Sequence, residues 1–152
     1  MTITRKTGFN PRIRGTSVMD GLVLGAKTIP TDITFAIADG ASTITEVEIS
    51  VVNEDGFIIP GVHALDVYLS DAATGVGITG TTASGTVQAK SASGTDIGIL
   101  TSKKALRVTT LATGIYTLEI TDSAKTGFYV AVASGIIPVQ VSRQLVTADY
   151  GA

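Results

Sequence analysis

From residue 33 onward, apolar side chains recur at every second position, and this alternation constrains the fold more than any other feature of the chain. An extended strand points successive side chains to opposite faces, so alternation gives each strand one apolar and one polar face. Such strands form antiparallel sheets with one buried and one solvated side. The clearest runs are Ile33, Phe35 and Ile37; Val47, Ile49 and Val51; Leu65, Val67 and Leu69; Tyr116, Leu118 and Ile120; Phe128, Val130 and Val132; and Ile137, Val139 and Val141.

Turn sequences separate these runs. Asn53 to Gly56 joins two strong strand candidates, and Asp122 to Gly127 joins two more. Residues 97–101 and 105–109 are weaker candidates. Short strands at roughly ten-residue intervals predict an all-β sandwich or barrel. No window of eleven or more residues shows a period of 3.6, so we expect little helix.

The length of 152 residues fits one ordinary domain. The chain is 44% hydrophobic with a net charge of −2, which excludes intrinsic disorder. Only 16% of the residues are charged, against roughly 25% in typical globular proteins, and Thr, Ser and Gly are abundant instead. There are no cysteines, which excludes a disulfide framework, a thiolate nucleophile and a cysteine-type zinc site.

We expect two parts: an extended basic N-terminal arm, residues 1–30, and a single β-sandwich domain, residues 31–152. The arm lacks sustained alternation and carries a net charge of +4, whereas the remainder carries −6. Residues 71–96 are predicted to form a Gly/Ser/Thr-rich hairpin or loop. Within them the tetrapeptide Ala-Ser-Gly-Thr occurs at 83–86 and again at 92–95, as two similar turns of a hairpin or by chance.

No targeting or membrane segment is expected. The first apolar stretch, residues 21–26, is too short and too far from the N-terminus for a signal peptide. The most apolar window, residues 128–141, is interrupted by Ser134, Gly135 and Pro138, so it falls short of a membrane span. We therefore expect a soluble protein made in the cytoplasm.

Two features match part of a cofactor or metal site but lack the surrounding sequence that such a site requires. Residues 75–80 match the dinucleotide pattern G-x-G-x-x-G, but the residues that follow are poor helix formers. His63 is the only histidine and follows a Pro-Gly turn, which is typical of a solvated loop residue. We predict no cofactor and no metal ligand here.

The two pairs of neighbouring carboxylates do not indicate a catalytic or Ca²⁺ site either. Glu46 and Glu48 project from the same face of one strand, but their alternating neighbours form the apolar face, which favours an exposed polar surface. Glu54 and Asp55 form an acidic pair in a turn, which is not specific for Ca²⁺. No serine elbow or P-loop is present, so we predict a protein without catalytic residues.

The basic arm admits three interpretations. A nucleic-acid site would use its cations on phosphates, but only Phe9 is available for stacking and the whole chain is acidic. An unordered tail is the second interpretation. The third is a protein interface that docks on an acidic surface of another subunit, with Arg5, Lys6, Phe9, Arg12 and Arg14 as the contact residues.

Two segments resemble bacterial Ig-like, invasin-type repeats. Residues 47–62 show alternating apolar residues, an acidic turn ending in glycine, and a Pro-Gly before the next strand. Residues 114–121 are similar to a later strand of such domains, in which Gly-x-Tyr precedes an alternating run. The resemblance implies an Ig-like sandwich in which Tyr116 forms a corner hydrogen bond. A jelly-roll is the alternative fold, because alternation does not reveal strand order.

The stretch from Leu65 to Ala152 also resembles structural proteins of tailed bacteriophages, on residues 68–75, 125–130 and 141–151. This resemblance implies a virion component with no catalytic residues. The first hypothesis is a capsid decoration (cement) protein on the capsid surface, which binds the major capsid protein, forms dimers or trimers, and contacts neither nucleic acid nor membrane. The alternative is a tail- or fibre-associated Ig-like adhesin that binds host glycans, although the chain has no Trp, four Tyr and four Phe.

Overall fold

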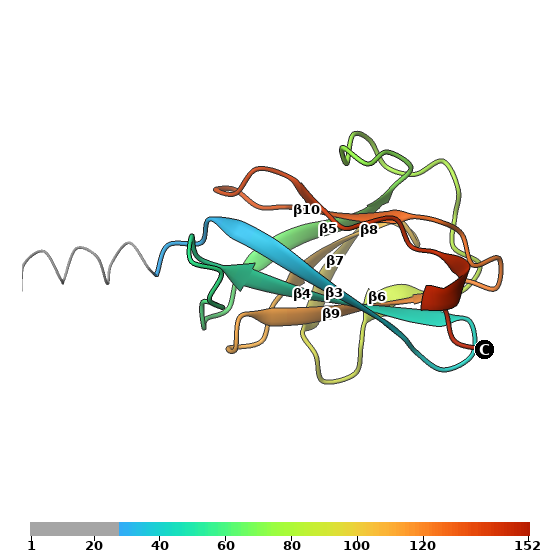
Figure 1. The fold of residues 1–152 in the computed structure, drawn as a ribbon, viewed down its shortest axis with the longest axis horizontal. Coiled ribbons are helices and arrows are strands. Elements are labelled where there is room, and N and C mark those ends of the chain that lie inside the picture. Colours follow the sequence, from blue (N-terminus) through green and yellow to red (C-terminus); the bar gives the residue numbers. More distant parts are fainter. Residues whose placement is uncertain (1–27) are drawn as a thin grey trace, which may run out of the picture.

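The computed structural model describes residues 28–152, which form two antiparallel sheets stacked face to face (Figure 1). The predicted contact residues of the arm lie outside the described residues; they are Arg5, Lys6, Phe9, Arg12 and Arg14. One sheet has the order β3 (Asp32–Asp39), β4 (Ile44–Val52), β9 (Ile115–Thr121), β6 (Val87–Ala89). The other has the order β11 (Gln140–Val141), β10 (Tyr129–Ala133), β5 (Ala64–Ser70), β8 (Ala105–Thr109), β7 (Thr95–Thr101), and a short 3₁₀ helix, η1 (Thr147–Asp149), follows β11.

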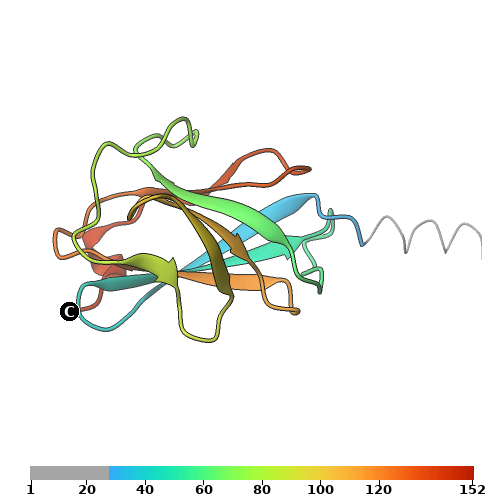
Figure 2. The ribbon, with the colours of Figure 1, turned by 180° about the vertical axis from the view of Figure 1, so that it is seen from behind.

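The strand order is that of an Ig-like sandwich. In their order across the first sheet, β3, β4, β9 and β6 occupy the positions of strands A, B, E and D. In the second sheet, β5, β10 and β11 occupy those of C, F and G. Strands β8 and β7 extend the second sheet beyond β5. Because they follow β6 in sequence, the chain crosses from one sheet to the other and back before β9 (Figure 2). The predicted all-β antiparallel sandwich is confirmed, and the order favours the Ig-like form over the jelly-roll.

The core lies between the sheets and is built from the inward positions that the alternation marked. Val47 and Ile49 of β4 face Val67 and Leu69 of β5 across it, and all four are at most 1% exposed. Burying each aliphatic side chain of this kind contributes roughly 1.5–3 kcal/mol. The alternation thus identifies the residues that hold the two sheets together.

Two strand predictions need correction. The run from Ile137 to Val141 forms a strand only at Gln140–Val141; Ile137 is buried, but Pro138 lacks the N–H that a ladder requires and Val139 is exposed. The alternation in residues 46–51 predicts that Ser50 faces water together with Glu46 and Glu48, yet Ser50 is buried. The chain beyond β4 folds back on the strand end, where the Ile59 N–H donates to the Val51 carbonyl, so alternation no longer separates the two faces.

The segment 71–96 is not a hairpin. It consists of a loop, the short strand β6 on one sheet, a turn, and the start of β7 on the other sheet. The two copies of Ala-Ser-Gly-Thr have a shared role. Each glycine, Gly85 and Gly94, passes so close to β9 that a Cβ atom would overlap Thr121 or Tyr116.

The corner hydrogen bond expected of Tyr116 is absent. Its ring is completely buried, and its hydroxyl donates to the Asp96 carboxylate at 2.7 Å instead of to a nearby backbone carbonyl. The corner tyrosine of Ig-like domains lies at the start of strand F, whereas Tyr116 lies in β9, at the position of strand E. From there its hydroxyl reaches the edge strand β7 of the other sheet. Among residues 28–152, no helix has the length and apolar character required to cross a membrane.

Candidate functional site

The first candidate surface is the end of the sandwich at which the described chain begins, the left end in Figure 1. Three connections meet there: residues 53–63, 110–114 and 134–139. Their large apolar side chains point to solvent, and Phe57 is 69% and Ile136 74% exposed. We call this the apolar loop end; its other exposed apolar members are Ile29, Ile58, Val62 and Leu111.

The connection that carries Phe57 is held in one conformation by Asn53. The buried Asn53 side chain accepts hydrogen bonds from the N–H groups of Asp55 and Phe57, each at 3.0 Å. Gly56 has a φ of +81°, which closes the turn in a conformation that glycine adopts without strain. Phe57 is therefore presented by an ordered turn.

The same connection is locked to residues 110–114. The Thr110 hydroxyl donates to the Gly61 carbonyl at 3.0 Å and accepts from the His63 N–H at 2.9 Å. Gly114, with a φ of +84°, approaches Ile59 so closely that a Cβ atom would overlap the Ile59 carbonyl oxygen. These contacts make two of the three connections a single unit.

A hollow of about 240 Å³ separates this unit from residues 134–137 and Pro30. The Ser134 hydroxyl oxygen accepts from the N–H groups of Ile136 and Ile137, which fixes the third connection. Most of the residues that line the hollow are apolar. Asp32 at the start of β3, and Glu54 and Asp55 in the connection after β4, bring carboxylates to the neighbouring chain segments. An apolar surface with a polar rim is typical of a protein-interaction site.

His63 contributes to this unit and is not the solvated residue expected from its sequence context. It is half-buried, and its ring nitrogen Nε2 lies 3.0 Å from the Ile59 carbonyl oxygen. Within residues 28–152, no group of three or more His, Cys, Asp or Glu side chains is placed to hold a metal ion.

The glycine-rich motif at 75–80 lies in the loop after β5, and no helix follows it. Its ends are tied by side chains: Tyr68 donates to the Gly75 carbonyl at 2.7 Å, and Asp71 accepts from the Thr79 hydroxyl and the Gly80 N–H. The Thr79 hydrogen bond, followed by that of Gly80, lowers the pKa of Asp71. The motif therefore lacks the helix N-terminus that a pyrophosphate site requires.

Glu46 and Glu48 lie on the outer face of the four-stranded sheet, as predicted. Glu46 forms an ion pair with Lys90 at 2.5 Å and stands directly opposite Glu119 in the β4–β9 ladder. Glu48 is exposed and opposite Thr117. Because Glu46 is paired with Lys90 and Glu48 is exposed, the two do not form a pair of carboxylates in an apolar pocket, the arrangement that acid–base chemistry uses.

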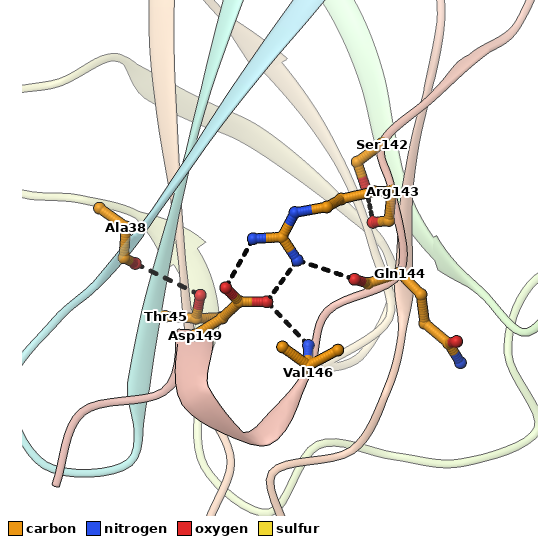
Figure 3. Close-up of polar contacts among 7 residues, drawn as sticks. All are labelled: Ala38, Thr45, Ser142, Arg143, Gln144, Val146 and Asp149. Atoms are coloured by element: carbon orange, nitrogen blue, oxygen red, sulfur yellow. Dashed lines mark hydrogen bonds and ion pairs between the residues drawn. The ribbon is translucent and has the colours of Figure 1, made fainter.

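The C-terminal region is fastened by a bidentate ion pair (Figure 3). Arg143 donates to both oxygens of Asp149, at 2.6 and 2.7 Å, and Asp149 also accepts from the Val146 N–H. The Arg143 hydrogen bonds are the main reason that the pKa of Asp149 is lowered. This ion pair fixes η1, which contacts β3, to the segment after β11, so we assign it a role in the fold.

The second candidate surface is the side of the sandwich where two edge strands, β7 of one sheet and β6 of the other, lie next to each other. A hollow of about 420 Å³ lies between these strands, with the buried side chains of Val87 and Leu106 in its lining. Ile97 and Ile99 of β7 border it and are exposed. The alternation in the sequence predicted a strand here, but its position at a sheet edge depends on strand order, which no local pattern carries.

Comparisons with known proteins identify no family: neither a known protein family nor a curated protein matches the chain. Among solved structures, the chain is similar to part of a β-glycosidase from Bacteroides vulgatus, with 14% sequence identity and a TM-score of 0.46. The similarity covers 78% of this chain and 14% of that one, so the chain spans a small part of the glycosidase's length.

Proposed function

We propose that this protein is a non-enzymatic capsid decoration (cement) protein of a tailed bacteriophage, which binds the outer shell and stabilises contacts between capsid subunits. The observation that carries the proposal is the apolar loop end, whose exposed side chains stand on hydrogen-bonded turns at the end of the sandwich where the described residues begin. The partner is the major capsid protein, and the location is the capsid surface.

Rigid loops favour binding because little conformational entropy is lost when they dock. Phe57 and Ile136 would enter apolar depressions between capsid subunits, where aromatic and aliphatic anchors contribute most of the binding energy. Each copy would contribute modest affinity, and many copies on one lattice would stabilise the shell together.

The distribution of positive charge supports an electrostatic role for the N-terminal residues. All six basic side chains of residues 28–152 bond to groups within the domain, whereas the first 27 residues contain five more. We therefore assign Arg5, Lys6, Phe9, Arg12 and Arg14 to contact with an acidic surface of a neighbouring capsid subunit. The internal bonds are Lys90 to Glu46, Lys103 to the Ser84 carbonyl, Lys104 to the Thr79 and Gly80 carbonyls, Arg107 to Asp66, Lys125 to the Gly151 carbonyl and Arg143 to Asp149.

Co-sedimentation of the purified chain with shells of the phage that encodes it tests the proposal. The double variant Phe57→Ser/Ile136→Ser should bind at least about tenfold more weakly, since two exposed apolar anchors are lost. Val76→Ser is the matched control, because Val76 is 77% exposed in the loop after β5, outside the three connections, and its loss should leave binding unchanged. Binding to host glycans without binding to shells would contradict the proposal and favour the adhesin alternative.

A further inference from the structure

The four edge strands of the sandwich differ in how they avoid pairing with other chains. An edge strand presents unpaired backbone groups, and proteins protect such edges by shortness, charge or cover. Strands β11 and β6 have two and three residues, and β3 carries Asp at both ends. Strand β7 has seven residues, pairs with β8 alone among the described strands, and contains neither Lys nor Pro.

The exposed apolar side chains of β7 add to its open backbone. Ile97 is 53%, Ile99 71% and Leu100 50% exposed. The register against β8 shifts at two places, which makes Ile97 and Leu100 the extra residues of two bulges. Bulges increase the local twist of an edge, but they leave these three apolar side chains in water.

The one charged residue of β7 is already engaged within the domain. Asp96 accepts from the Tyr116 hydroxyl at 2.7 Å and from the Ala89 N–H at 2.8 Å. Its two oxygens therefore point toward β9 and β6. Asp96 is exposed, but its carboxylate is held by these two bonds; the lining of the adjoining hollow includes Val87 and Leu106 together with Lys103.

We propose that β7 is a self-association edge at which a second copy of this chain adds its own β7 in antiparallel orientation, about a two-fold axis at Gly98. In this register Ile97 faces the partner's Ile99, and Asp96 faces the partner's Leu100. The isoleucines then meet one another on both sides of the axis, and the two Asp96 carboxylates are kept apart because each lies opposite a leucine. A two-fold interface requires such self-complementarity.

The composition of the strand favours a second copy over an unrelated partner. The register about Gly98 leaves no like charges opposed and places the smallest residue at the axis, where the two backbones approach most closely. The product is one continuous sheet of ten strands. This inference does not depend on capsid binding, because it concerns the protein free in solution.

Sedimentation velocity on the full chain without shells is the first test. The wild type should sediment as a dimer, and Ile99→Lys should raise the dimer dissociation constant at least about tenfold, since the substitution places a charge on each side of the apolar pairing. Val76→Lys is the control and should remain dimeric. A monomeric wild type, or an Ile99→Lys variant that dimerises as well as the wild type, would overturn the proposal.

A single cysteine tests the register. The chain has no cysteine, and a Cβ atom at Gly98 would meet only Arg107 Cβ, at 3.9 Å, so Gly98→Cys should fold. Residues opposite each other at the two-fold lie within the Cα separation that a disulfide spans. Mild oxidation should yield a disulfide-linked dimer for Gly98→Cys and not for the control Val76→Cys. Equal cross-linking of both variants would contradict the register.

A further variant tests whether a second copy or the N-terminal residues of this chain pair with the β7 edge. Residues 21–26 are apolar and precede the described chain. Leu24→Lys in the full chain should leave the dimer intact. If the Leu24→Lys variant is instead a monomer, residues 21–26 occupy the edge, and the β7–β7 pairing is overturned.

Discussion

Asp122 shows how this domain holds a carboxylate that is only 1% exposed. Its oxygens accept from the N–H groups of Ser84, Ala124 and Thr126, and so tie the loop before β6 to the turn after β9. Burial alone would raise the pKa of Asp122, but the hydrogen bonds from Thr126 and Ser84 outweigh it and lower the pKa. The ionised carboxylate is thus part of the fold.

Asp122→Asn should reduce the free energy of unfolding by about 1–3 kcal/mol at pH 7, because the amide NH₂ meets a backbone N–H that needs an acceptor. A lowered folded-state pKa stabilises the protein above the unfolded pKa of about 3.9, and this contribution is lost as the pH falls through the folded pKa. Urea unfolding between pH 2 and pH 7 should show a shallower pH dependence for the variant. An unchanged slope would contradict this role of Asp122.

Tyr116→Phe removes the hydroxyl that reaches Asp96 while keeping the buried ring. We expect a loss of about 1.5–3 kcal/mol in the free energy of unfolding, as for a hydrogen bond to a charged group. Burial is the main cause that raises the pKa of Tyr116, so the protein should lose stability as the pH rises above about 10. Tyr68→Phe, which removes a bond to the Gly75 carbonyl, is the control and should affect alkaline stability less.

At the scale of elements, the contact between residues 53–63 and 110–114 determines the shape of the apolar loop end. Gly114→Ala should lower the free energy of unfolding by at least about 2 kcal/mol, since it combines a positive φ with overlap on the Ile59 carbonyl. Gly56→Ala has a similar φ but open space around it, so about 1 kcal/mol is expected. Thermal unfolding compares the two variants; equal losses would show that the close approach is unimportant.

Local pattern predicted most of the elements but not their arrangement. The alternation at Val47–Val51 and Tyr116–Ile120 located β4 and β9, because a strand with one buried face leaves that trace in sequence. It missed β6, where three residues are too few to show a period. Strand order depends on long-range pairing, so the exposed edge at Ile99 was not foreseeable.

The candidate surfaces were predictable only in part. The turn at Asn53–Gly56 was read correctly from its residue types, but the exposure of Phe57 follows from how Asn53 holds that turn. Tyr116 was assigned a backbone partner by resemblance, whereas its partner is Asp96 on the other sheet. Such contacts join residues that are distant in sequence, and no spacing rule records them.

At the scale of the whole molecule, the sandwich carries a net charge of −6 and its six basic side chains bond within the domain, whereas five basic residues lie in the first 27. Exposed ion pairs such as Arg107–Asp66 contribute little to stability, and their main effect is to occupy the cations of the domain locally. Replacing Arg5, Lys6, Arg12 and Arg14 with Ala should weaken shell binding and reduce its salt dependence, because screening acts on the contacts that are lost. Binding assays at low and high salt measure both effects; an unchanged salt dependence would count against the assignment.

The location of the chain in a particle tests the central proposal most directly. Electron microscopy of purified particles of the encoding phage, with the copy number determined by quantitative gel, should place many copies on the outer capsid surface. Each should contact more than one capsid subunit, with Phe57 and Ile136 at the contact. Density confined to the tail or its fibres, or absence of the chain from the particle, would contradict the proposal.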